Sequence, residues 1–248
     1  MHTIYARDLS RMIHSHVVGT IVILFLMMMG AMFFADFFDG IQELSLRKFF
    51  SQAPLLLSIF CPALTMDAFA GDRSRLEWLQ TMPVRTTHIV LAKFLSCMTM
   101  LAVVLAFTLS YPITIRTLGP IDWGPVVGGY VALILLGGGY TALGIFASAC
   151  TRDRVSAILL AFFLCFGLTY IHRIAADSSG MTATVLQSLS ASAHFSNAAR
   201  GILDIRDLIY ALTLQAIALT ATGLVIEAKK YPKIDAPRAP RAAYRRSR

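Results

Sequence analysis

The sequence has 248 residues, of which 56% are hydrophobic and only 15% are charged. A soluble domain carries about a quarter of charged residues, so this composition excludes the soluble classes of protein. The formal net charge of +8 comes mostly from the C-terminal tail, and because no nucleic-acid-binding motif accompanies it we expect no nucleic-acid partner.

Six predominantly apolar stretches of the chain contain no Asp, Glu, Lys or Arg, and each has at least 18 residues. A helix needs about 20 apolar residues to cross a bilayer. We therefore expect an all-α integral membrane protein with six transmembrane helices, in one transmembrane domain over residues 17–227. The six stretches are 12–35, 49–66, 94–115, 123–151, 155–172 and 208–226.

Lys and Arg gather on one side of this predicted topology. Of the 22 basic residues, 16 fall there, and the six on the other side are diluted by acidic residues. The positive-inside rule then predicts that both termini and residues 71–93 are cytoplasmic. The basic residues on that side are Arg7, Arg11, Arg73, Arg75, Arg85, Lys93, Arg152, Arg154 and eight in the tail.

The two ends of the chain predict contact with the membrane surface. Residues 1–16 mix apolar and charged side chains, which is typical of a cytoplasmic interfacial helix. The first apolar stretch has no small-residue cleavage site after it, so we interpret it as an anchor and not as a cleaved signal peptide. Residues 228–248 are basic and punctuated by proline, which indicates a disordered cytoplasmic tail attracted to anionic membrane lipid.

A charged interruption, residues 71–93, separates the second and third apolar stretches. Ser74 and Glu77 have the spacing of a capping box, and Pro83 disfavours helix at the residue before it, so we expect a short amphipathic helix over 74–82. Such a helix lies either on the bilayer or against a protein, and we expect it to dock onto an ATPase. The simpler alternative is that its charged residues form a solvated helix face. The predicted coupling residues are Arg73, Arg75, Leu76, Glu77, Leu79, Gln80 and Pro83.

Between the third and fifth apolar stretches, proline and glycine indicate where helices end and how closely they pack. The third helix is expected to end at Pro112. In the fourth, six glycines follow Pro125, which predicts close packing against neighbouring helices. The connection 150–155 is so short that the fourth and fifth helices must form an antiparallel hairpin.

The largest external segment is expected to be 174–206. Apolar residues recur at helical spacing in its second half, which predicts an amphipathic or partly re-entrant helix leading into the last span. The residues marked on this external helix are Phe195, Arg200, Asp204, Arg206 and Asp207.

The chain lacks three motifs that would indicate particular enzyme classes. It contains no GxxxxGK[ST], no HExxH and no GxSxG, so it does not bind ATP through its own P-loop and is expected to be non-catalytic. Met27, Met28 and Met29 are consecutive, and on a helix they point in different directions, so we expect no metal site and no cofactor. Asp67 lies near the cytoplasmic end of the second span, where contact with interfacial water explains it.

Three runs of sequence resemble ABC-2-type transporter permeases, in particular the gliding-motility subgroup. They are LTMDAFAGDRSRLEWLQTMPVRTTHIVLAKFL, LGPIDWGPVVGGYVALILLGGGYTALGIFASAC and SAHFSNAARGILDIRDLIYAL. Glu77, Thr81, Pro83 and Val84 match the pattern of the cytoplasmic segment in that family. Asp67, Gly71 and Asp72 depart from it, because a basic residue is usual at the first position and acidic residues at the other two.

The resemblance implies an ABC-2 permease fold with type V exporter-like architecture. It also implies two such units in the bacterial inner membrane, where this multi-pass chain pairs with a second copy or with a related permease or auxiliary subunit. A separate ATP-binding subunit, itself a dimer, would drive export or energy transduction. The alternative is an integral membrane enzyme or scaffold with no ATPase partner.

Overall fold

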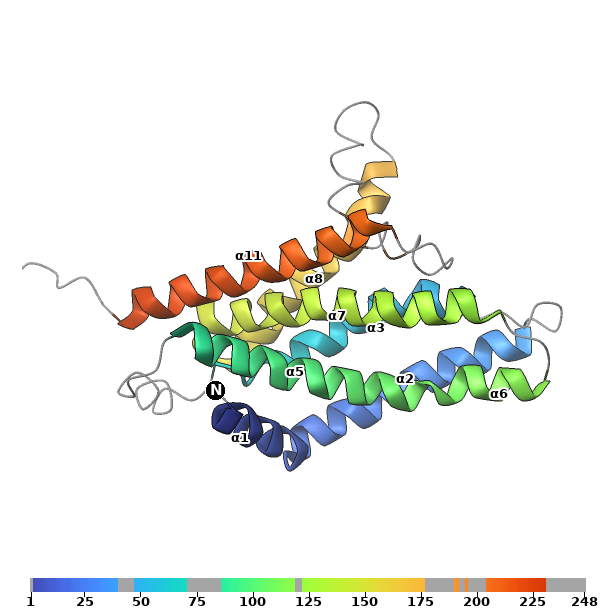
Figure 1. Cartoon of the computed structure of the whole chain (residues 1–248), viewed down its shortest axis with the longest axis horizontal. Coiled ribbons are helices and arrows are strands. Elements are labelled where there is room, and N and C mark those ends of the chain that lie inside the picture. Colours follow the sequence, from blue (N-terminus) through green and yellow to red (C-terminus); the bar gives the residue numbers. More distant parts are fainter. Residues whose placement is uncertain are drawn as a thin grey trace, which may run out of the picture.

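The computed structural model of the chain is a bundle of helices (Figure 1). It describes residues 2–39, 47–70, 86–118, 122–176, 190–191, 195 and 204–230, and every regular element among them is a helix, as expected. The helices are α1 (His2–Ile13), α2 (His16–Asp39), α3 (Arg47–Thr65), α5 (Thr86–Thr108), α6 (Ser110–Leu118), α7 (Trp123–Cys150), α8 (Arg154–Ala176) and α11 (Ile205–Lys230).

Five helical stretches in the described part of the chain are long and apolar enough to cross a membrane. They coincide with five of the six charge-free stretches, so the chain has the character of a multi-pass membrane protein. The five are His16–Ala35, Thr86–Thr117, Trp123–Cys150, Arg154–Ile171 and Ile205–Lys229.

The remaining apolar helix, α3, matches the second charge-free stretch, 49–66. Its apolar part, Phe49–Thr65, has 17 residues, which is short for a helix that crosses a membrane. The helix ends at Thr65 because residues 66–70 form turns, in which Phe69 and Ala70 donate their backbone N–H groups to a side chain of α7. α3 is nevertheless largely buried among α2, α7 and α8.

α7 lies at the centre of the bundle, and its glycines pack closely, as predicted. A Cβ on Gly137 would overlap Leu101 of α5, and one on Gly138 would lie 2.6 Å from the amide nitrogen of Gln215 on α11. A Cβ on Gly144 would overlap the hydroxyl of Thr65 on α3. Glycine thus lets three neighbouring helices approach the α7 backbone.

The expected end of the third helix at Pro112 is wrong. The helix is interrupted at Leu109 but resumes as α6, and Pro112 is the third residue of that helix. The first four N–H groups of a helix have no partner within it, so a proline in this turn removes no hydrogen bond.

The chain runs back and forth along the bundle, so α1, the start of α5 and the end of α11 lie at one end (Figure 1). The connection from α7 to α8 spans only Thr151 to Asp153, and the two helices pack side by side. The predicted antiparallel hairpin is therefore confirmed. Two ion pairs join separate segments at this end of the bundle.

Candidate functional site

The charged end of the bundle holds a set of cross-helix contacts that we call the ionic layer, made by Asp8, Asp67, Lys93, Arg154 and Lys229. Its most buried part joins α1 to α5. Lys93 Nζ lies 3.5 Å from Asp8 Oδ2, and the two side chains are only 7% and 11% exposed. Asp8 Oδ2 has no hydrogen bond of good geometry, so the ammonium group of Lys93 compensates its charge through space.

Further polar contacts fix the same two helices together. The Tyr5 hydroxyl lies 2.9 Å from Thr99 Oγ1, and Ser96 Oγ donates to the Tyr5 carbonyl at 3.3 Å. Lys93 Nζ also lies 5.2 Å from the ring centroid of Phe69, in the turn after α3, which is within the range of a cation–π interaction. α1 is therefore docked against α5.

The second ion pair joins the end of α3 to the start of α8. Arg154 Nε lies 2.8 Å from Asp67 Oδ1, although without hydrogen-bond geometry, and the two side chains are 51% and 24% exposed. Asp67 also lines a cavity of about 60 Å³ together with Asp8 and Lys93. A space of that size is large enough for water, so the first ion pair and the carboxylate of the second border one small cavity.

A single hydroxyl anchors the turn that follows α3. Ser148 Oγ, which is fully buried in α7, accepts hydrogen bonds from Phe69 N and Ala70 N at 3.0 Å each. It donates one to the Met66 carbonyl, also at 3.0 Å. This hydroxyl satisfies three backbone groups, so Ala70, the last described residue before 71–85, is held against α7.

The last contact of the ionic layer joins α11 to the end of α7. Lys229 Nζ donates to the Ala149 carbonyl at 2.5 Å and to the Cys150 carbonyl at 3.5 Å. The last carbonyls of a helix have no partner within it and carry partial negative charge. Lys229 therefore caps α7 from a neighbouring helix.

Of the predicted coupling segment, 71–93, the structure describes 86–93 as the start of α5, and for 71–85 it describes only the flanking residues. The seven predicted coupling residues lie outside the described residues, namely Arg73, Arg75, Leu76, Glu77, Leu79, Gln80 and Pro83. The flanks are Ala70 and Thr86, the first residue of α5, and both belong to elements of the ionic layer. No group of three or more His, Cys, Asp or Glu among the described residues could hold a metal ion.

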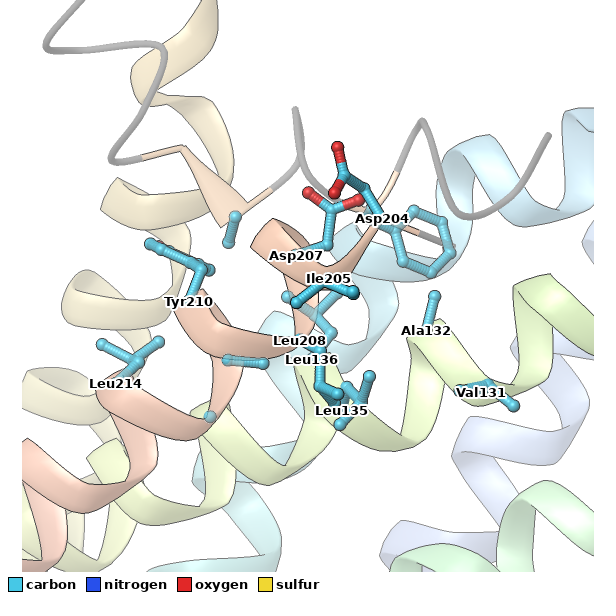
Figure 2. A pocket seen from close by; sticks show the side chains of 14 residues that line it. Val131, Ala132, Leu135, Leu136, Asp204, Ile205, Asp207, Leu208, Tyr210 and Leu214 are labelled. Carbon is cyan, nitrogen blue, oxygen red and sulfur yellow. The ribbon is translucent and has the colours of Figure 1, made fainter. Parts of the chain in front are cut away.

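Three predicted residues of the external helix come together at a second cavity, of about 300 Å³, between α7 and α11 (Figure 2). Phe195, Asp204 and Asp207 line it. Arg206 is exposed and does not line it, and Arg200 lies outside the described residues. The walls are mostly apolar side chains of the two helices, including Val131, Leu135, Leu136, Leu208, Ala211 and Leu214.

Sequence reasoning missed both ion pairs and the Ser148 anchor. For Asp8 a signal exists, because it lies four residues from Ile4 and four from Met12 and so shares the apolar face of α1. A carboxylate on an apolar face requires a buried cation. Nothing in the sequence identifies that cation as Lys93, which is 85 residues away.

Two arrangements of side chains are the candidates for a functional site. The ionic layer joins six helices, and the second cavity lies between α7 and α11. No protein-family model matches the chain, and the comparison with curated proteins finds no match.

Proposed function

We propose that the chain is the membrane permease subunit of an ABC-2-type transporter, driven by a separate ATP-binding subunit. Six crossings, with the short α3 as the second of them, bring both ends of the chain to the same side of the membrane. The observation that supports this best is that Ala70 and Thr86, which flank residues 71–85, belong to elements that Lys93 of the ionic layer joins through its contact with the Phe69 ring. A segment attached at that place can move several membrane helices at once.

The contacts of the ionic layer suggest how a push on 71–85 would spread. Ala70 bonds to Ser148 of α7, and Asp67, three residues earlier, pairs with Arg154 of α8. On the other flank, Lys93 of α5 pairs with Asp8 of α1. A displacement of 71–85 would therefore reach α1, α5, α7 and α8 together.

In this mechanism, the chain supplies no nucleotide chemistry, because it has no phosphate-binding loop. Closure of the ATPase dimer would press on the 74–82 segment, with Arg73 and Glu77 against the ATPase surface and Pro83 at the bend before α5. The energy that drives the membrane helices would then be the difference in ATPase affinity between their two arrangements. A second copy or a related permease would complete the transmembrane unit in the bacterial inner membrane.

The test is coupled ATP hydrolysis. An ATP-binding cassette protein is first sought among the products of the neighbouring genes; the chain is then co-expressed with it, purified as the complex and reconstituted in liposomes. We expect the double substitution Arg73→Ala and Glu77→Ala to lower the hydrolysis that depends on the permease by about tenfold, since it removes charged contacts from a protein interface. Arg7→Ala, an exposed residue of α1, is the matched control and should leave hydrolysis unchanged.

Two results would contradict the proposal. One is a permease-dependent rate that is the same in the double variant and in the wild type. The other is biological activity of the reconstituted chain in the absence of any ATPase, which would favour an integral membrane enzyme or a scaffold.

A further inference from the structure

We propose that the interruption at Leu109 is a hinge between α5 and α6, and that the hydroxyl group of Tyr130 on α7 holds it in the observed arrangement. The inference concerns the fold of this chain and does not depend on an ATPase. It assigns a role to a buried tyrosine hydroxyl that the coupling mechanism does not use.

The sequence determines where the helix is interrupted. In a continuous helix, the carbonyl of Thr108 would accept a hydrogen bond from the N–H group four residues later. The residue at that position is Pro112, which has no N–H group. Just before the interruption, Leu109 N donates to the Ala106 carbonyl at 3.2 Å, with the tighter spacing of three residues. The Thr108 carbonyl therefore needs a donor from another part of the protein.

Tyr130 provides that donor from α7. Its hydroxyl donates to the Thr108 carbonyl at 2.8 Å, and Thr108 Oγ1 lies 3.2 Å from the same hydroxyl oxygen. Thr108 is fully buried and Tyr130 is only 8% exposed. A carbonyl without a donor is costly in an apolar interior, and a neighbouring helix can satisfy it. This contact therefore holds the end of α5 against α7.

α6 is held by a different helix. The ring of Tyr111 stacks on that of Phe33 in α2, with 4.8 Å between the ring centroids. The Tyr111 hydroxyl also donates to the Leu26 carbonyl of α2 at 3.4 Å. Gly30 leaves space for this hydroxyl, since a Cβ there would lie 3.3 Å from it. Within three residues, the chain thus passes from attachment to α7 to attachment to α2.

Little resists a change of backbone angles between these two attachments. Ile113 N lies 3.5 Å from the Leu109 carbonyl oxygen, which is a long hydrogen bond. The Leu109 side chain is 42% exposed, so packing does not immobilise it. A hinge consists of a few residues at the end of an element that absorb such a change. A displacement of α2 relative to α7 would therefore be taken up at Leu109, and the Tyr130 hydroxyl would oppose it.

The experiment measures the distance between α5 and α6 by double electron–electron resonance, with the full chain in nanodiscs. Spin labels are attached to Leu95→Cys on α5 and Thr114→Cys on α6, which are both exposed positions. Cys150→Ser removes the exposed native cysteine, and the other three are buried. We expect Tyr130→Phe to widen the distance distribution about twofold, because the Thr108 carbonyl loses its donor while the aromatic ring stays.

Two further variants isolate the contact. Tyr140→Phe makes the same change on the same helix, but the Tyr140 hydroxyl lies 2.6 Å from Thr169 Oγ1 of α8, so the width should stay as in the wild type. Pro112→Ala restores the N–H group that a continuous helix directs at the Thr108 carbonyl. It should narrow the distribution, and in that background Tyr130→Phe should add no width.

Three results would overturn the proposal. The first is the same width in Tyr130→Phe and in the wild type, which would show that the hydroxyl does not hold α6 in place. The second is equal widening in Tyr140→Phe, which would indicate a general loosening of the bundle. The third is a full effect of Tyr130→Phe in the Pro112→Ala background, since the hydroxyl would then not act through the Thr108 carbonyl.

Discussion

Lys93 Nζ lies 3.5 Å from Asp8 Oδ2, and neither side chain is more than 11% exposed. α1 is thus joined to α5 by two opposite charges that are both withdrawn from solvent. Loss of one partner leaves the other buried without compensation, which costs about 3–5 kcal/mol.

From this relationship we predict that Asp8→Asn lowers the free energy of unfolding by about 3 kcal/mol, measured by thermal unfolding in detergent micelles. The double variant Asp8→Asn with Lys93→Met should be more stable than the two single effects added together, because no buried charge is left alone. Arg7→Gln, on the exposed side of α1, should be close to neutral. If the changes in unfolding free energy of the two single variants add up to that of the double variant, Asp8 and Lys93 do not interact.

The second ion pair should behave differently, because Arg154 is 51% exposed and Asp67 is 24% exposed. We predict that Arg154→Gln changes the free energy of unfolding by less than about 1 kcal/mol. The effect should fade at high salt, since solvent ions screen a partly exposed pair. A loss as large as that of Asp8→Asn would contradict this ranking.

Ser148 provides a third prediction. Ser148→Ala removes the acceptor for two backbone N–H groups and the donor to a carbonyl in the turn after α3. We expect the free energy of unfolding to fall by about 2–3 kcal/mol, because these buried groups lose their partner. Ser110→Ala is the control, since the exposed Ser110 hydroxyl bonds only to a carbonyl one turn earlier. Equal thermal unfolding midpoints for Ser148→Ala and Ser110→Ala would exclude an anchoring role of Ser148.

Two glycines of the bundle allow a matched pair of Gly→Ala substitutions. A Cβ at Gly144 would overlap the buried hydroxyl of Thr65, whereas a Cβ at Gly223 of α11 would meet nothing within 4 Å. We predict that Gly144→Ala destabilises the protein by about 1–3 kcal/mol, and that Gly223→Ala raises stability by up to about 1 kcal/mol through helix propensity. Thermal midpoints measure both, and a stabilising Gly144→Ala would refute the close packing of α3 on α7.

The topology can be tested with an impermeant maleimide on intact cells and on inverted vesicles. In a Cys150→Ser background, Thr3→Cys and Ala228→Cys should be labelled from the same side, and Asp122→Cys from the opposite side. The three remaining native cysteines are buried and should not react. Labelling of positions 3 and 228 from opposite sides would mean that the number of spans is odd and that α3 does not cross.

Sequence reasoning predicted the long helices well, because length and absence of charge are local properties. The stretch 123–151 became α7, and its glycines do lie at the centre of the bundle. The residues at which helices end were harder to predict. Pro112 is a helix breaker in most positions, but its cost disappears in the first turn of a new helix.

Contacts between segments that are distant in the chain could not be predicted from a single sequence. Asp67 was expected to meet interfacial water, yet it lies beside Arg154, and the pairing depends on how α3 and α8 pack. Of the predicted external residues, Phe195, Asp204 and Asp207 meet at one cavity, because they approach α7 from one side. The role of the 74–82 segment stays a prediction.

The unequal lengths of neighbouring helices have a consequence for the shape of the protein in the bilayer. At about 1.5 Å per residue, the 32 residues of Thr86–Thr117 extend about 48 Å, against a hydrocarbon thickness of about 30 Å. Such a helix must tilt or project beyond the lipid. Thr114, Arg116 and Thr117 of α6 are exposed, which suits projection into water at the end away from the ionic layer. The protein would then carry the short helix α6 above the membrane, and any molecule that approaches from that side would meet it before the lipid.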